Sequence, residues 1–304
     1  MALFKINQDK LTYIKEEKFK LEKEIQKLTE DNLPVIFGLD FVKSEFSLNN
    51  FRIDTLAFDK SSNSFVIIEY KRDKSFSVVD QGYAYLSLML NNKADFILEY
   101  NENGQHTLRR DDIDWSQSRV MFISPSFTTY QREAINFKDL PIELWEIKRY
   151  SNLSVSYNQV QTHGAQESIK MISRENDTIN DVSREIKVYT EDDHLSKAND
   201  EIKELYEKFK TSILNFDGVE VKPQKLYVAF IKNSSNTADF ELQKKAIKIS
   251  INLQIGMLDD PKGLARDVSK IGTWGNGDYQ IKVVNDDDFE YVLSLIKQSY
   301  KAKS

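Results

Sequence analysis

The 304-residue chain contains no cysteine, and this absence excludes several kinds of chemistry. Without a thiol there is no disulfide, no thiolate zinc site, no iron–sulfur cluster and no cysteine nucleophile. Histidine is nearly as scarce, because the chain has only His106, His163 and His194. They are far apart and lie in polar contexts, which predicts surface positions. The GxSxG, GxxxxGK[ST] and HExxH motifs of other enzyme classes are also missing.

Long apolar runs are absent as well. The longest, FVII and YLSLML, fall far short of the roughly 20 residues that a membrane helix needs. The first residues, MALFKINQDKLTYIKEEK, carry no apolar segment typical of a signal peptide. We therefore expect a soluble, cytoplasmic protein that does not contact a membrane.

The chain also lacks an excess of positive charge. Its formal net charge is −6, and the two halves of the chain share this charge about equally. Neither half is therefore a basic module of the kind that coats DNA. If nucleic acid is the partner, the contacts must come from a local basic patch.

The length and the pattern of apolar residues predict two domains. A chain of 304 residues is longer than one core usually organises, and 40% apolar residues are enough for real cores. We predict an α/β domain over residues 1–155, a polar linker over 156–186 and a smaller α+β domain over 187–304. In the first domain we expect a helix over 15–37, strands over 41–48, 51–59 and 64–71, a helix capped by Ser77, strands over 94–100, 119–124 and 143–150, and a short helix near 130–137.

The second domain has a similar mixture of elements. We expect a helix whose apolar stripe runs from Leu195 to Ile213, strands in KLYVAFIK, KAIKISINL and GDYQIKVV, and a closing helix in DDFEYVLSLIKQSY. The sequence shows no internal repeat and no low-complexity tract.

The stretch RIDTLAFDKSSNSFVIIEYKRDKS, residues 52–75, places charged residues inside two strands that should be buried. If the turn is centred between Ser61 and Ser62, the numbers of paired residues sum to 123. Asp54 then lies directly opposite Glu69, with the two side chains on the same face. Lys71 is two residues beyond Glu69 and shares that face.

Two carboxylates opposed across a sheet repel each other, and burying them without compensation is costly. A divalent cation removes the conflict, and Mg²⁺ prefers carboxylate and water oxygens. The metal and Lys71 would together activate a water and stabilise charge on a phosphodiester. The alternative is a solvated sheet face with an ordinary ion pair. The apolar run that precedes Glu69 favours the first interpretation, because it puts the acids at the end of a buried strand.

This hairpin resembles the core of the PD-(D/E)XK nuclease superfamily, with Ile53-Asp54 in place of Pro-Asp and Glu69-Tyr70-Lys71 as the ExK motif. The Gln81–Tyr85 spacing in DQGYAYL resembles the QxxxY motif of the RecB-like branch. Residues of about 15–150 also resemble NucS-like endonuclease domains in element order. The expected fold class is thus α/β, with a restriction-endonuclease-like α-β-β-β-α-β core followed by the α+β domain.

The resemblance implies roles for individual residues. Asp54 and Glu69 would hold Mg²⁺, for which Mn²⁺ would substitute, and Lys71 would complete the catalytic set. Gln81 and Tyr85 would line the DNA side. The segment LEKEIQ would supply a further metal-site acid, for which Glu22 is preferred to Glu24, although geometry alone does not separate them. Beyond the motif, the basic residues Arg72 and Lys74 would contact phosphates.

In the second domain the most distinctive stretch is DDPKGLARDVSKIGTWGNGDYQI, residues 259–281. One interpretation is a tight loop in which the glycines adopt positive φ. The other is a recognition surface, in which an aromatic side chain lies beside basic ones and stacks on a base or holds a phosphate. Its residues would be Trp274, Tyr279, Arg266 and Lys262. This half resembles an uncharacterised C-terminal domain sometimes called a "predicted transport protein", although no segment is long enough to cross a membrane.

The leading hypothesis is therefore a Mg²⁺-dependent DNA endonuclease whose second domain recognises the substrate or a partner, with defence against foreign DNA as one setting. The alternatives are a non-catalytic nucleic-acid- or protein-binding module that retains a nuclease fold, and a structural scaffold. A homodimer is a further expectation, because cleavage of both strands of a duplex favours two active sites.

Overall fold

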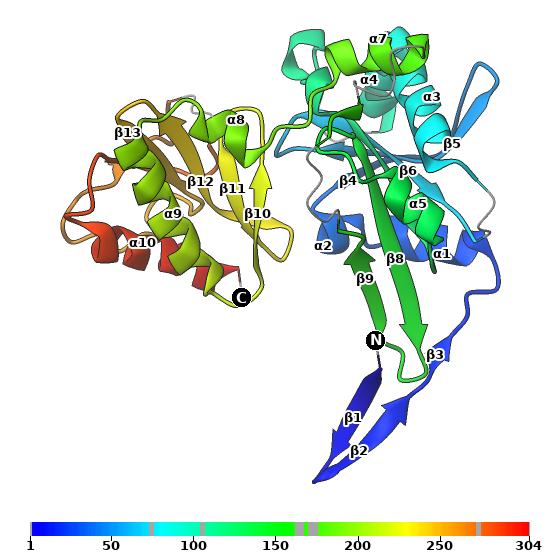
Figure 1. Cartoon of the computed structure of the whole chain (residues 1–304), viewed down its shortest axis with the longest axis horizontal. Coiled ribbons are helices and arrows are strands. Elements are labelled where there is room, and N and C mark those ends of the chain that lie inside the picture. The colour runs from blue at the N-terminus through cyan, green and yellow to red at the C-terminus, as the bar shows by residue number, and fades with distance from the viewer. Residues whose placement is uncertain are drawn as a thin grey trace. The chain divides into compact units, whose positions relative to one another are not determined.

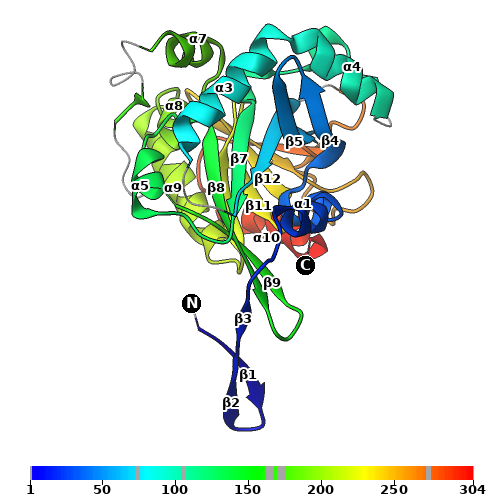
Figure 2. The same ribbon diagram turned by 90° about the vertical axis from the view of Figure 1, so that its right-hand side faces the viewer.

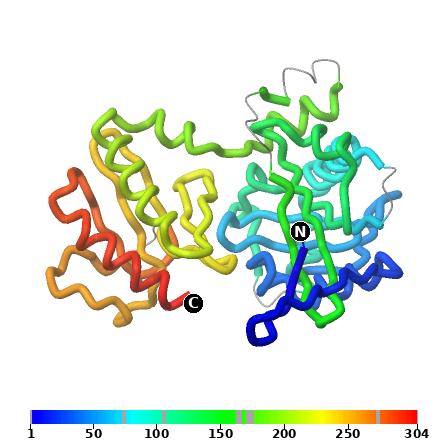
Figure 3. The backbone as a smooth tube through the Cα atoms, turned by 60° about the horizontal axis from the view of Figure 1, so that its bottom comes forward, coloured from blue at the N-terminus to red at the C-terminus, as the bar shows by residue number. Residues whose placement is uncertain are grey.

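The computed structural model describes residues 2–72, 76–103, 107–161, 167–169, 176–271 and 275–303. The chain forms two compact units, Met1–Val188 and Tyr189–Ser304 (Figures 1 and 3). Among the described residues, no helix combines the length and the apolar character needed to cross a bilayer.

The first unit is built on a mixed seven-stranded sheet with the order β3-β8-β7-β6-β5-β4, and β9 pairs with β8. The strands β4, β5 and β6 form an antiparallel meander, whereas β6, β7 and β8 are parallel. This confirms the expected mixed α/β class. The bounds are β3 (Glu16–Glu17), β4 (Asp40–Leu48), β5 (Phe51–Asp59), β6 (Ser64–Tyr70), β7 (Arg119–Ser124), β8 (Ile142–Tyr150) and β9 (Val155–Gln159).

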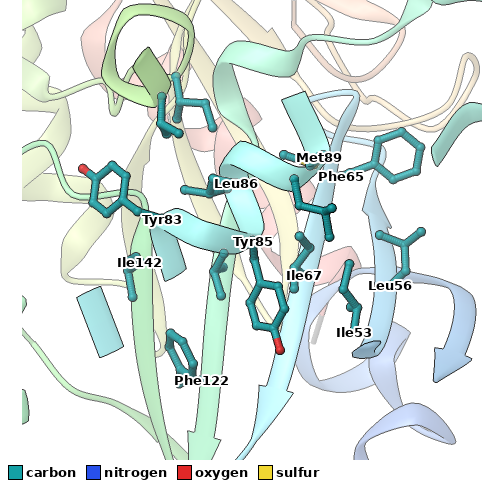
Figure 4. Close-up of a cluster of buried hydrophobic side chains, with 14 of the residues drawn as sticks. Ile53, Leu56, Phe65, Ile67, Tyr83, Tyr85, Leu86, Met89, Phe122 and Ile142 are labelled. Carbon is teal, nitrogen blue, oxygen red and sulfur yellow. The ribbon is translucent and has the colours of Figure 1, made fainter. Parts of the chain in front are cut away.

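Helices cover both faces of this sheet (Figure 2). On one face lie α1 (Glu22–Glu30) and α2 (Leu33–Phe37), on the other α3 (Val78–Asn91), α4 (Lys93–Asn103) and α7 (Asp177–Glu185), and α5 (Thr129–Ala134) follows β7. Figure 4 shows Leu86 and Met89 of α3 packed with Leu56, Phe65 and Ile67 of the sheet. Alternate residues of β6, such as Val66 and Ile68, point instead to the α1 side.

The central hairpin forms as the sequence predicts. Asp59 pairs with Ser64 and Thr55 with Ile68, so the paired numbers sum to 123. The predicted cap of α3 is also present, because the Ser77 Oγ accepts a hydrogen bond from the Asp80 N–H. Gly38 ends α2 with a φ of 67°.

Two predicted elements of this unit are wrong. Residues 94–100 were expected to form a strand, but they belong to helix α4. Phe96 and Tyr100, four residues apart, bury one face of this helix against Phe58 and Phe65. The expected helix over 15–37 begins only at Glu22, because Glu16–Glu17 form strand β3. It is then interrupted after α1, and a new helix begins with Pro34 in its first turn.

The expected linker over 156–186 also differs from the structure. Strand β9 extends the sheet in this range, and α7 packs on α3. Four aliphatic side chains of this range or next to it are buried in the same core as α3, namely Ile169, Ile179, Val182 and Ile186. The first unit therefore extends to Val188.

The second unit has two layers, a six-stranded antiparallel sheet with the order β10-β11-β12-β13-β15-β14 and the helices that pack on it. The bounds are α8 (Glu191–Leu195), α9 (Asp200–Leu214), β10 (Val219–Pro223), β11 (Val228–Lys232), β12 (Ser235–Gln243), β13 (Ala246–Ile251), β14 (Arg266–Asp267), β15 (Tyr279–Val283) and α10 (Phe289–Ala302). The closing helix and three of the strands are confirmed, whereas β10, β12 and β14 were not predicted. The predicted helix with a stripe from Leu195 to Ile213 begins only at Asp200, because Leu195 ends the separate helix α8. His194 is buried and its Nε2 lies 2.7 Å from the Gln224 carbonyl oxygen, so its predicted surface position is wrong.

The revised boundary predicts how the first unit tolerates truncation. A fragment of residues 1–188 should fold, whereas a fragment of residues 1–155 should lose several kcal/mol of stability. It lacks the four buried aliphatic side chains, each of which stabilises the fold by about 1.5–3 kcal/mol when fully buried. Urea denaturation of the two fragments measures the difference, and equal midpoints would show that the expected linker was correct after all.

Candidate active site

The candidate site lies where β5 separates from β6. The antiparallel ladder between these strands ends at Thr55 and Ile68, while β6 stays paired with β7 through Tyr70. The Tyr70 N–H donates a hydrogen bond of 3.0 Å to Asp54 Oδ2. A carboxylate thus accepts where a strand carbonyl would accept in a continued ladder. Asp54 and Glu69 are brought together at this opening.

Glu69 is the centre of the hydrogen-bonded group, and only 4% of its surface is exposed. Its Oε1 accepts from Lys71 Nζ at 2.7 Å and from Gln81 Nε2 at 3.2 Å. The same Gln81 nitrogen lies 3.2 Å from the Tyr85 hydroxyl. The structure therefore brings together five of the residues predicted from the sequence, from two strands and from helix α3.

Helix α3 carries Gln81 and Tyr85 close to the sheet because a glycine lies between them. A Cβ atom at Gly82 would be 2.4 Å from Ile142 Cδ1, a distance at which something must shift. The glycine of the DQGYAYL stretch thus allows the close approach of α3 to β8. Burial of Tyr85 and then the charge of Glu69 raise the pKa of this tyrosine, so its hydroxyl stays protonated.

The electrostatics of the site are unbalanced. Burial raises the pKa of Asp54 from 3.8 to about 6, and the negative charge of Glu69 acts in the same direction. Lys71 forms its ion pair with Glu69, and Asp54 has no ion-pair partner among the described residues. Glu69 Oε2 is buried and makes no hydrogen bond within the described part of the chain.

These donors fit a hard divalent cation. They are carboxylate oxygens, and Mg²⁺ is commonly held by one or two carboxylates together with waters. A cation here would offset the effects of burial and of the Glu69 charge that raise the pKa of Asp54. It would also give Glu69 Oε2 a ligand, since this oxygen makes no hydrogen bond among the described residues. The residues that would hold it are Asp54 and Glu69.

The third predicted acid, Glu22, is placed differently. Its Oε1 accepts a hydrogen bond of 2.7 Å from the Arg72 N–H, just beyond the ExK motif. Glu24 instead approaches Arg149 of β8 at 3.4 Å. Glu22 is thus the acid associated with the end of β6. In the described residues no three acidic or histidine side chains lie together as a metal site, so a metal-binding role for Glu22 stays a prediction.

The predicted phosphate contacts flank the motif. Arg72 is exposed, and its Nη1 donates a hydrogen bond of 2.6 Å to the Lys20 carbonyl oxygen. Lys74 lies outside the described residues.

The sequence analysis missed a polar network on the opposite face of the sheet. Gln26 of α1 is buried, and its Nε2 donates to the Asp54 carbonyl oxygen at 3.0 Å and to Ser44 Oγ at 3.1 Å. One turn further along α1, Glu30 Oε1 accepts from Thr55 Oγ1 at 2.5 Å. Glu22, Gln26 and Glu30 are spaced four residues apart, so they lie in one row along α1. This row contacts Asp54 and Thr55 of β5 and Arg72, which follows β6. That spacing is the signal that could have revealed the network.

A further acid beside the site was also missed. The register on either side places Glu45 of β4 opposite Asp54, and Glu45 adopts a positive φ of 55°. Its charge adds to the rise in the pKa of Asp54, and its Oε2 lies 2.8 Å from Arg52 Nε. No sequence motif marks this residue.

The predicted recognition residues of the second unit do not form one surface among the described residues. Lys262 Nζ lies 2.8 Å from Asp288 Oδ1, next to α10. Arg266 bonds to Gln280 on one face of the sheet, whereas Tyr279 packs into the core on the other face. Trp274 lies outside the described residues.

Among the comparisons with known proteins, the match to a family model lies within the second unit, whereas the similar sequence covers both units. Residues 191–303 match the family described as "Domain of unknown function (DUF5655)". The whole chain is similar to a Haemophilus influenzae protein described as "Uncharacterized protein". The two are 52% identical over 302 residues, which cover 99% of this chain and 100% of that protein.

Two solved structures are also similar. The "crystal structure of a repair endonuclease from Pyrococcus abyssi" shares 21% identity at a TM-score of 0.22, and the match covers 39% of this chain and 44% of that one. The "Structure of EndoMS-dsDNA2 complex" shares 15% identity at a TM-score of 0.28, covering 48% and 64%. The chain thus spans less than two thirds of either structure. At these values the likeness concerns the fold and carries no argument about activity.

The raised pKa of Asp54 predicts a pH-dependent effect of Asp54→Asn in the presence of EDTA. The folded pKa of about 6 lies above the unfolded value of 3.8, so the wild-type protein loses stability as pH rises between these values. Relative to wild type, the variant should become more stable from pH 4 to pH 6 and then keep an advantage of about 1–3 kcal/mol.

Urea unfolding at pH 4, 6 and 8 measures this difference. Asp111→Asn, which changes an exposed carboxylate of the same unit, serves as the control and should show no such trend. A pH-independent difference for Asp54→Asn would contradict the assigned environment.

Proposed function

We propose that this chain catalyses metal-dependent hydrolysis of phosphodiester bonds in DNA. The chain belongs to the same family as the Haemophilus influenzae protein that it matches over its whole length. One observation carries the proposal: Asp54 and Glu69 meet where β5 and β6 separate, with Lys71 and Gln81 hydrogen-bonded to Glu69.

A structural ion pair would be arranged differently, and the same strands provide the comparison. At their other ends, the partly buried Arg119 lies within 3.0 Å of Asp59 and 2.9 Å of Glu143, so one cation contacts both acids. At the candidate site Lys71 contacts Glu69 alone. Asp54 is left with a raised pKa, and Glu69 Oε2 with no hydrogen bond among the described residues. This unbalanced arrangement favours a site that receives a cation over a closed structural pair.

In the proposed reaction an oxygen of water bonds to phosphorus, one P–O ester bond breaks, the water loses a proton and the leaving oxygen gains one. A bound Mg²⁺ or Mn²⁺ supplies Lewis-acid stabilisation of the phosphate charge. Lys71 places a positive charge beside Glu69, where it orients the attacking water or stabilises the charge that develops on the phosphate. Gln81 and Tyr85 fix the position of Glu69 and face the substrate side. The second unit selects the substrate or a partner.

Lys71→Ala tests the chemistry. The variant removes the charge but keeps both carboxylates, so cleavage of DNA in Mg²⁺ or Mn²⁺ should fall by about 10²–10³, while DNA binding in Ca²⁺ persists. EDTA should abolish wild-type cleavage. The substrates are duplex, single-stranded and branched DNA.

Lys60→Ala is the matched control, because Lys60 follows the opposite end of β5 and pairs with Asp40. It should cleave like wild type. Wild-type binding without cleavage of any DNA form in either metal would instead support the non-catalytic binding module.

Gln26 is a positioning residue in this proposal, because it holds the Asp54 backbone from the opposite face of the sheet. Gln26→Met keeps a similar volume but removes the hydrogen bonds. We expect weaker Mn²⁺ binding and a lower kcat, in addition to a loss of about 1–3 kcal/mol of stability. Calorimetric titration with Mn²⁺ measures the affinity.

The control for this experiment is Thr29→Val, which removes a buried hydroxyl of the same helix that bonds to Tyr157. It should reduce stability without changing Mn²⁺ affinity. If both variants lose stability and neither loses metal affinity, Gln26 has a structural role only.

A further inference from the structure

The first strands of the chain form a separate hairpin. Among the described residues, strands β1 (Leu3–Asn7) and β2 (Lys10–Ile14) pair only with each other and make a two-stranded sheet of their own. In Figures 1 and 2 this hairpin projects from the seven-stranded sheet of the first unit, past the turn between β8 and β9.

One face of the hairpin is apolar and exposed. Phe4 pairs with Tyr13 and Ile6 with Leu11, so these four side chains share a face. They are 45%, 60%, 73% and 65% exposed, respectively. The opposite face is polar towards the tip, with Lys5 opposite Thr12 and Asn7 opposite Lys10, whereas Leu3 lies opposite the buried Ile14 at its base.

An isolated two-stranded hairpin is at best marginally stable in water, and a hydrophobic face needs a second layer. The alternation over β1 and β2 is that of one layer of a β-sandwich. Within the described residues, the four apolar side chains keep about half or more of their surface exposed. The described residues of the first unit therefore leave this face without a second layer.

We propose that this layer is the same hairpin of a second copy, so that two hairpins stack their apolar faces around a two-fold axis. The two faces match in width and length, because a two-fold interface uses the same patch on both chains. If the axis passes over Thr12, Leu11 lies over Tyr13 of the partner subunit, and the aliphatic and aromatic side chains interdigitate.

The charges at the two ends of β2 complement each other in this arrangement. Asp9 lies in the turn at the tip of the hairpin, and Lys15 directly follows β2 at its base. Antiparallel stacking places Asp9 over the partner's Lys15, whereas parallel stacking would place each charge over its like. Among the described residues neither Asp9 nor Lys15 forms an ion pair, so both are available to the second copy.

The area of the hairpin face sets the strength of this contact. Large side chains that are about half exposed contribute on the order of 100 Å² each. Four of them give roughly half of the ~800 Å² that each partner buries in a standard interface. The contact should therefore be a reversible dimer that depends on protein concentration. Double-stranded DNA is a poorer occupant of this face, because its exposed side chains are apolar.

Sedimentation equilibrium of the full chain over a range of concentrations tests the proposal. Wild type should form dimers that dissociate on dilution, and Leu11→Lys should be monomeric throughout. Thr12→Lys adds the same charge at the neighbouring position on the polar face and should dimerise like wild type. Thermal melts establish that both variants are folded. A wild type that stays monomeric at high concentration, or Leu11→Lys that dimerises normally, would overturn the proposal.

Charge reversal tests the orientation. Asp9→Lys and Lys15→Asp should each weaken the dimer several-fold, and the double variant should restore it, because the reversed charges again face each other. If the double variant is weaker than either single one, the antiparallel stack is wrong. No readout here involves DNA, so the outcome is independent of the proposed nuclease activity.

Discussion

The separation of β5 from β6 at Asp54 is the constraint on which the candidate site depends. Strand β6 must continue beside β7, because the Lys71 N–H donates to the Ile123 carbonyl oxygen. Strand β5 leaves one step earlier, and the Asp54 carboxylate accepts the Tyr70 N–H in its place. This single substitution of a side chain for a backbone acceptor turns the end of a buried ladder into an opening lined by two acids. A continued ladder would have closed it.

The opening is held from both faces of the sheet. On the α3 face, Gln81 donates to Glu69, and the neighbouring Gly82 permits the close approach of α3 to Ile142 of β8. On the α1 face, Gln26 holds the Asp54 carbonyl oxygen. Because the acids repel each other, the free energy that keeps them together must come from these flanking contacts and from the apolar core on either side. The site is therefore a property of the whole three-layer arrangement.

The sequence predicts the parts of this site that depend on local spacing. A short turn defines the register of β5 and β6, and the Ser77 cap defines the start of α3. It does not predict contacts that depend on distant segments. Gln26 meets residues 18 and 28 positions away, and the helical state of residues 94–100 depends on burial against other strands. The C-terminal boundary of the first unit was missed for the same reason. The sequence around α7 is mostly polar, and its few aliphatic residues that pack in the core give no clear helical pattern.

The second unit shows why a raised pKa alone does not identify a site. Asp239 is buried, and its pKa is raised by burial to about 7, further than that of Asp54. Both of its oxygens are nevertheless hydrogen-bonded, to Asn236 and to the backbone and side chain of Asn276, so it fixes a loop onto the sheet. Asp54 differs in its neighbour: Glu69 adds a second negative charge and an oxygen without a hydrogen bond among the described residues. Repulsion between adjacent acids, more than burial, distinguishes a place that receives a cation from one that is already complete.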